Sequence, residues 1–193
     1  MTKKITKFAL ISLTAIFVSS CSQFAYFNDN KSKIPANPKF YLSSVNVKIS
    51  EQRILPLGID SNKNDLMTDN EIKDFTREEI VNYLKKENIY SDLPEGNNVF
   101  ECNFDISFIK NYYMFTNFKY AGISMNGYKI SVLKDGKPFA SSEDVNHYFI
   151  NNRGLGWGGF FRIITFSLNK DDEKNMVGIF SRSVAGNMKD FGK

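Results

Sequence analysis

The most constraining feature of this chain is the run VFECNFDISFI at residues 99–109, in which apolar and polar side chains alternate. Successive side chains of a β-strand point to opposite faces, so a period of two indicates a half-buried strand. The apolar face comprises Phe100, Cys102, Phe104, Ile106 and Phe108, and the polar face comprises Glu101, Asn103, Asp105 and Ser107. The pattern therefore predicts a sheet with one covered face, and it places Cys102 in the core as a small apolar residue.

Other strands are predicted from similar patterns. In residues 40–50, one face is expected to carry Tyr41, Val45, Val47 and Ile49. A further strand contains Tyr128, Ile130 and Val132. Asp135 and Gly136 form the dipeptide of a tight hairpin, which predicts a return strand from Phe139. Residues 160–168 read as a last strand.

Two helices are predicted around these strands. The first spans residues 69–90, and Thr68 and Glu71 have the spacing of a capping box at its start. Its apolar stripe consists of Ile72, Phe75, Ile80, Tyr83 and Leu84. The second helix opens with the acidic residues 171–173, which favour a helix N-terminus. Its apolar stripe consists of Met176, Phe180, Val184 and Met188.

The order of these elements predicts an α+β fold. We expect a mainly antiparallel sheet of about four or five strands, with two helices packed on one face. The folded part is expected to be a single domain over residues 40–193. Residues 21–39 are polar and contain Pro35 and Pro38, which is typical of a linker. The aromatic residues Phe24, Tyr26 and Phe27 in this linker either rest at a membrane interface or are incidental.

The N-terminus has the layout of a secretory signal. Lys3, Lys4 and Lys7 precede an apolar stretch over residues 8–18, which is too short for a spanning helix of about 20 residues. The stretch ends in Val18-Ser19-Ser20-Cys21. This tetrapeptide resembles the lipobox of bacterial lipoproteins. The alternative is an ordinary signal peptide that ends beside a cysteine.

The resemblance to a lipobox implies a lipid anchor. In that family the cysteine is lipidated on sulfur, the signal peptide is cut before it, and the new N-terminus is acylated. Here residues 1–20 would be removed, and Cys21 would become the lipidated first residue. Ser22 stands where an aspartate usually retains Gram-negative lipoproteins at the inner membrane. The resemblance therefore implies a palmitate-bearing protein of the outer membrane, facing the periplasm.

Charge and cysteine content exclude several classes of function. Removal of the signal peptide takes away three lysines and lowers the net charge from +4 to about +1, so a nucleic-acid-binding role is not indicated. After lipidation of Cys21, Cys102 has no partner for an internal disulfide. His147 is the only histidine, so a zinc site or a catalytic triad would depend on single residues.

The domain resembles the periplasmic domains of small envelope lipoproteins. The likeness is one of element order over about residues 40–190: a helix containing NYLKKENIYSDL, the strand FECNFDISFI and the hairpin YKISVLKDGKPF. It points to auxiliary lipoproteins of lipid and lipopolysaccharide transport and to the N-terminal domain of curli-secretion lipoproteins. Such domains bind envelope proteins or lipid and do no chemistry.

A calcium loop is one candidate site. Asp60, Asn62, Asn64 and Glu71 occupy ligand positions of an EF-hand-like loop over residues 60–71. However, Asp65 stands where the loop needs glycine, and Leu55-Pro56-Leu57-Gly58 replaces the incoming helix. We expect no cofactor, with calcium as the alternative.

Aromatic side chains form two further candidate sites for a protein or lipid partner. Trp157, Phe160 and Phe161 lie in or beside the glycine-rich stretch 154–159. A tryptophan there either anchors a partner or folds back onto the sheet. Tyr113, Phe115 and Phe118 lie in the aromatic run 112–120 and form either an exposed patch or part of the core.

The sequence as a whole favours a non-catalytic, lipid-anchored accessory protein of the cell envelope. A cell-wall or lipid hydrolase is a second hypothesis, although the chain has no compact catalytic motif. Glu143 and Asp144, for example, would face opposite sides of a strand. A surface-exposed antigen or toxin antagonist is the third hypothesis.

Overall fold

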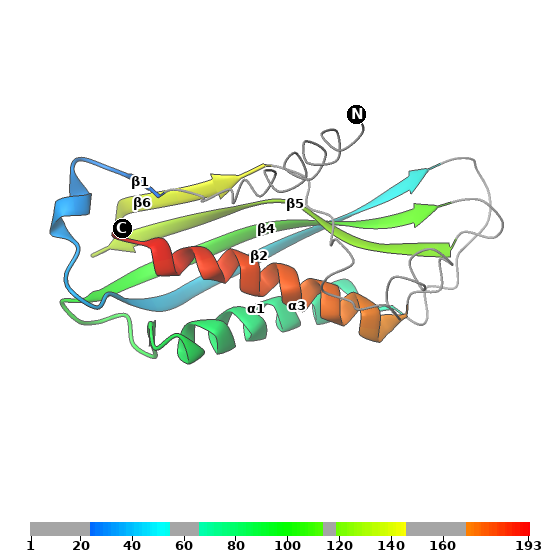
Figure 1. Cartoon of the computed structure of the whole chain (residues 1–193), viewed down its shortest axis with the longest axis horizontal. Coiled ribbons are helices and arrows are strands. Elements are labelled where there is room, and N and C mark those ends of the chain that lie inside the picture. The colour runs from blue at the N-terminus through cyan, green and yellow to red at the C-terminus, as the bar shows by residue number, and fades with distance from the viewer. Residues whose placement is uncertain (1–23, 55–65, 114–118, 146–168) are drawn as a thin grey trace, which may run out of the picture.

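The structure is a computed structural model that describes residues 24–54, 66–113, 119–145 and 169–193. Its described strands form one sheet in the order β1-β6-β5-β4-β2-β3. They are β1 (Ala25–Tyr26), β2 (Lys39–Ile54), β3 (Tyr90–Ser91), β4 (Val99–Tyr113), β5 (Lys119–Lys134) and β6 (Lys137–Asp144). The described helices are α1 (Asp69–Lys86) and α3 (Lys170–Gly186), with short 3-10 helices η1 (Asn30–Lys33) and η3 (Asn187–Asp190). Helices α1 and α3 lie side by side on one face of the sheet (Figure 1).

The predicted α+β class and the helical layer are confirmed, but the sheet is mixed. Strand β2 runs parallel to both β3 and β4, whereas the other neighbours are antiparallel. The prediction of a mainly antiparallel sheet is therefore wrong for β2. The physical reason is α1, which crosses over between β2 and β4 and returns the chain in the same direction. The sheet has six described strands, of which β1 and β3 contain two residues each.

Strand β4 carries the centre of the core. All five apolar residues of the predicted face are buried, and the exposed fraction of Cys102 is 0%. The strand extends to Tyr113, beyond the predicted end at residue 109. Burial raises the pKa of the Cys102 thiol far above its usual value, which keeps the thiol protonated and unreactive. The interpretation of Cys102 as a core residue is confirmed.

Strand β2 contains an irregularity that the alternation did not reveal. Leu42 pairs with Cys102 and Ser44 pairs with Asn103, so Ser43 is an extra residue in the ladder. The extra residue exchanges the two faces of the strand. Phe40 and Leu42 therefore join the core before this point, and Val45, Val47 and Ile49 join it afterwards. The prediction that Tyr41 shares the face of these residues is wrong, because Tyr41 pairs with Glu101 on the opposite face.

Helix α1 begins as predicted and ends earlier than predicted. The capping box is confirmed: Thr68 accepts a hydrogen bond from the Glu71 backbone, and Glu71 accepts one from the Thr68 backbone. The helix ends at Lys86 rather than at residue 90. Asn88 has a φ of 54°, which stops the helix and redirects the chain into β3. The predicted stripe packs inward, with Phe75 and Tyr83 only partly buried.

Helix α3 runs parallel to α1. Lys170 pairs with Glu71 at the first turns, Arg182 pairs with Glu79, and Lys189 of η3 pairs with Glu87 beyond the last turn of α1. These ion pairs at the surface align α3 along α1, and each adds little to the free energy of unfolding. The predicted stripe is confirmed, since Met176, Phe180, Val184 and Met188 are all buried. Among the described residues, no helix has the length and apolar character needed to cross a membrane.

Residues 24–39 are part of the fold, in contrast to the predicted linker over residues 21–39. Ala25 and Tyr26 pair with Ser141 and Ala140 of β6. Phe24 is buried and packs edge-on against Phe191, with 5.2 Å between the ring centroids. This segment folds because Phe24 completes an aromatic cluster with the C-terminal residues, and that long-range contact is invisible to local composition. The folded domain therefore includes residues 24–39, which precede its predicted start at Phe40.

Candidate functional site on the open face of the sheet

The face of the sheet opposite the helices is polar and is contributed by four neighbouring strands. Its side chains, all exposed or half-buried, are Ser44, Asn46 and Lys48 of β2, Asn103, Asp105 and Ser107 of β4, Lys129 and Ser131 of β5, and Ser141 and Glu143 of β6. The described helices α1 and α3 cover one face of this sheet, so the other face can carry polar side chains in contact with solvent. We call this set the open face.

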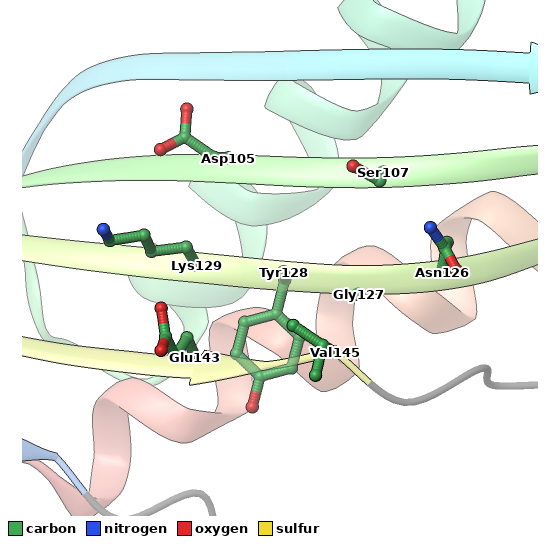
Figure 2. A pocket seen from close by; sticks show the side chains of 8 residues that line it. All are labelled: Asp105, Ser107, Asn126, Gly127, Tyr128, Lys129, Glu143 and Val145. Carbon is green, nitrogen blue, oxygen red and sulfur yellow. The ribbon is translucent and has the colours of Figure 1, made fainter.

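A row of charged and amide groups crosses the open face. The strand register aligns Asn46, Asp105, Lys129 and Glu143 on adjacent strands. Asn46 Nδ2 donates a hydrogen bond to Asp105 Oδ1 at 2.9 Å. Figure 2 shows Asp105, Lys129 and Glu143 side by side on three neighbouring strands. Adjacent strands lie about 4.8 Å apart, and Lys129 occupies the strand between those of Asp105 and Glu143.

A hollow of about 270 Å³ lies beside this row. Its lining includes Asp105, Ser107, Asn126, Gly127, Lys129, Glu143 and Val145 (Figure 2). Tyr128 contributes to the lining, but its hydroxyl accepts a hydrogen bond from Asn187 Nδ2 of η3 at 2.8 Å and so belongs to the helical side. The hollow is thus a depression in the sheet surface that is lined mostly by polar residues, with an exposed apolar residue, Val145, among them.

Gly127 and the extra residue of a β-bulge, Asn126, are among the residues that line the hollow. Ser107 pairs with Gly127 while Phe108 pairs with Met125, which leaves Asn126 as an extra residue. Gly127 has a φ of 151°, and a Cβ atom there would lie 2.6 Å from the carbonyl oxygen of Asp144. Only glycine allows β5 to approach the end of β6 this closely. The backbone at Asp144 and Val145, where β6 ends, occupies the place that a side chain at position 127 would take.

The arrangement is suited to binding by hydrogen bonds and charge. Asp105 and Glu143 are separated by the whole of β5, so they cannot share a proton as a carboxylate pair does. Ser107 is among the lining residues, and none of the described lining residues is a histidine that could serve as its base. Within the described ranges, no group of three or more His, Cys, Asp and Glu side chains is placed to hold a metal ion.

A second hollow, of about 520 Å³, lies where the helices end. It is lined by residues 37–40 and 87–89 together with Met188, Lys189 and Phe191. The polar groups at its rim bind one another: Lys39 Nζ donates to the Asn88 side chain at 3.0 Å, and Lys189 Nζ lies 2.8 Å from Glu87. This hollow is larger, but its charges are engaged, so the open face is the better candidate for recognition.

A buried polar cluster joins the helix starts to the sheet. Lys110 Nζ donates to the Met67 carbonyl at 2.6 Å and lies 3.7 Å from Glu173 Oε1. The Met67 N–H in turn donates to Glu173 Oε2 at 2.7 Å. Lys110 continues the core face of β4 two residues after Phe108, which is the signal that could have revealed it. Its hydrogen bonds are all internal, so we interpret the cluster as structural.

The remaining sites predicted from sequence are only partly within the described residues. Cys21, Asp60, Asn62, Asn64, Phe115, Phe118, Trp157, Phe160 and Phe161 all lie outside them. Tyr113 is the last residue of β4, at the boundary of a described segment. The predictions for the lipid anchor, the calcium loop and the aromatic patches therefore stay predictions. The sequence predicts part of the open face, because the alternation in β4 places Asp105 and Ser107 on the polar side of that strand.

Glu71, the last predicted calcium ligand, is already engaged. Its carboxylate lies 2.5 Å from Lys170 Nζ and accepts the hydrogen bond of the capping box. The Lys170 interaction first, and the backbone of Thr68 second, hold the pKa of Glu71 at about 2. A calcium ion at this residue would compete with the ammonium group of Lys170 for the Glu71 carboxylate.

Comparisons with known proteins do not identify a family. No protein-family model matches the chain, and neither does any curated protein. A solved crystal structure of a protein described as uncharacterized is similar, with 12% sequence identity and a TM-score of 0.41. The similarity covers 78% of this chain and 96% of that one. A likeness at this level carries no argument about function.

Proposed function

We propose that the protein is a lipid-anchored accessory component of the cell envelope that binds a protein or lipid partner and does no chemistry. The observation that carries the proposal is the sequence Val18-Ser19-Ser20-Cys21 at the end of a basic and apolar N-terminus. The polar open face supports a binding role, because its groups are arranged to donate and accept hydrogen bonds across four strands. The two aromatic segments around Trp157 and Phe115 supply additional contacts in this proposal.

The proposed location is the outer membrane, with the domain in the periplasm. Ser22 follows the anchor, where aspartate would retain a Gram-negative lipoprotein at the inner membrane. Protease added to intact cells should leave a periplasmic domain undigested and should digest it once the outer membrane is permeabilised. Digestion in intact cells would favour the surface-exposed alternative.

The anchor is tested by metabolic labelling with radioactive palmitate. The chain has two cysteines, and they provide matched variants. We expect Cys21→Ala to abolish labelling and to release the protein from the membrane fraction. Cys102→Ala removes a buried thiol and should leave the labelling intact. Equal labelling of both variants would contradict the proposal.

A further inference from the structure

The distance between the proposed anchor and the folded domain is short. Cys21 precedes Phe24 by three residues, and a chain spans at most about 3.6 Å per residue. Whatever path the intervening residues take, the lipidated residue therefore lies within about 11 Å of Phe24. A lipoprotein with a long linker has no such restriction. The inference that follows rests on the proposed lipidation of Cys21.

The first described residues are held firmly in the domain. The Phe24 ring packs against Phe191, and the Tyr26 hydroxyl accepts a hydrogen bond from the Gly192 backbone at 2.6 Å. The Phe27 N–H donates to the Phe139 carbonyl at 3.1 Å. The segment is thus tied both to β6 and to the C-terminus. A bilayer that holds Cys21 must therefore lie close to the edge of the sheet formed by β1 (Figure 1).

The surface beside β1 has the composition of a membrane-contacting surface. Phe24 turns into the core, whereas the exposed fraction of Phe27 is 43%. Lys31 and Lys33 follow in η1, and neither forms an ion pair with an acidic side chain in the described part of the chain. An exposed aromatic ring beside basic residues suits the boundary between acyl chains and anionic headgroups.

We propose that the β1–η1 edge, defined as residues 24–33, rests on the phospholipid bilayer that carries the lipid anchor. The Phe27 ring enters the interface, and Lys31 and Lys33 contact anionic headgroups. A membrane is a better occupant than a protein because the anchor forces this edge to within about 11 Å of the lipid. The opposite edge of the sheet, at β3, then points away from the bilayer. The open face stands beside the membrane and stays accessible to a partner.

The test uses the full-length acylated protein in vesicles of phosphatidylethanolamine and phosphatidylglycerol. A fluorophore is attached to a cysteine introduced by Phe27→Cys or, as the matched control, by Leu93→Cys. Leu93 is an exposed apolar residue just beyond β3, five strand spacings or about 24 Å across the sheet. Cys102 does not compete for the label because it is fully buried. Lys33→Cys provides a second reporter at the β1–η1 edge.

The measurement is the quenching of each fluorophore by phospholipids that carry a nitroxide on the headgroup. We expect loss of fluorescence at positions 27 and 33 and no loss at position 93. Equal quenching at all positions, or no quenching at 27 and 33 while the protein still floats with the vesicles, would overturn the placement and leave the anchor intact. A protein that carries no acyl chain and does not float would overturn the proposed anchoring, and the placement with it.

Discussion

At the scale of single residues, Gly127 lines the hollow on the open face, where β5 approaches the end of β6. Gly127→Ala would place a methyl group 2.6 Å from the Asp144 carbonyl oxygen, at a φ of 151°. We expect the substitution to lower the free energy of unfolding by about 1–3 kcal/mol, measured by urea denaturation. Gly136→Ala is the control, because it also has a positive φ but no atom within 4 Å of the added Cβ. An equal loss in the two variants would show that close approach to β6 is not the cause.

Glu71 gives the domain a pH dependence in acid. Its pKa is held at about 2 in the folded protein, below the ordinary value of 4.5, chiefly by Lys170. A depressed carboxyl pKa stabilises the fold above pH 4.5, and this contribution is lost as the pH falls through about 2. We therefore expect Glu71→Gln to lose stability at neutral pH and to approach the wild type in acid.

Denaturation curves of the wild type and the Glu71→Gln variant between pH 2 and 7 measure this effect. Because Glu71 is exposed, added salt should weaken the contribution of its charge to the free energy of unfolding. Lys170→Ala removes the main cause of the lowered Glu71 pKa. Like Glu71→Gln, it should therefore make the free energy of unfolding depend less on pH. If wild type and Glu71→Gln differ in free energy of unfolding by the same amount at every pH, the pH dependence does not come from Glu71.

At the scale of secondary-structure elements, the Lys110–Glu173 pair joins the start of α3 to the sheet. Lys110→Met would leave the fully buried Glu173 carboxylate without its ammonium partner. We expect a loss of about 3–5 kcal/mol in the free energy of unfolding. The double variant with Glu173→Met should lose less than the sum of the two single variants, since it removes both charges. Additive losses would show that the two groups do not interact.

The sequence predicted those elements whose signal is local. The alternation in β4, the capping box of α1 and the Asp135-Gly136 hairpin each depend on neighbouring residues, and each is confirmed. The Asp135 and Gly136 φ angles of 52° and 71° fit the tight turn that this dipeptide favours.

The elements that were predicted wrongly depend on distant contacts. The extra residue Ser43 becomes visible only when β2 is paired with β4. Residues 24–26 look like a linker because their partners, Phe191 and β6, lie more than a hundred residues further along the chain. The candidate site on the open face also depends on contacts between residues that are distant in the sequence. Alternation placed Asp105 on a polar face, but its alignment with Lys129 and Glu143 follows from strand register.

At the scale of the whole molecule, the residue after the anchor is expected to set the location. Ser22→Asp introduces the aspartate that usually retains lipoproteins at the inner membrane. We expect the variant to move from the outer-membrane to the inner-membrane fraction of a density gradient, with its acylation unchanged. Ser22→Asn, which has a similar shape without the charge, is the control. Unchanged distribution of Ser22→Asp would contradict outer-membrane sorting through this position.

The most direct test of the lipid anchor is the mass of the mature N-terminal peptide, isolated from membranes after proteolysis. The account predicts a peptide that begins at Cys21 and carries a diacylglyceryl group on sulfur and an acyl chain on the amino nitrogen. Such an N-terminus would leave two residues, Ser22 and Gln23, between the lipid and the packed side chain of Phe24. A mature chain that begins at another residue, or an unmodified Cys21, would contradict the account.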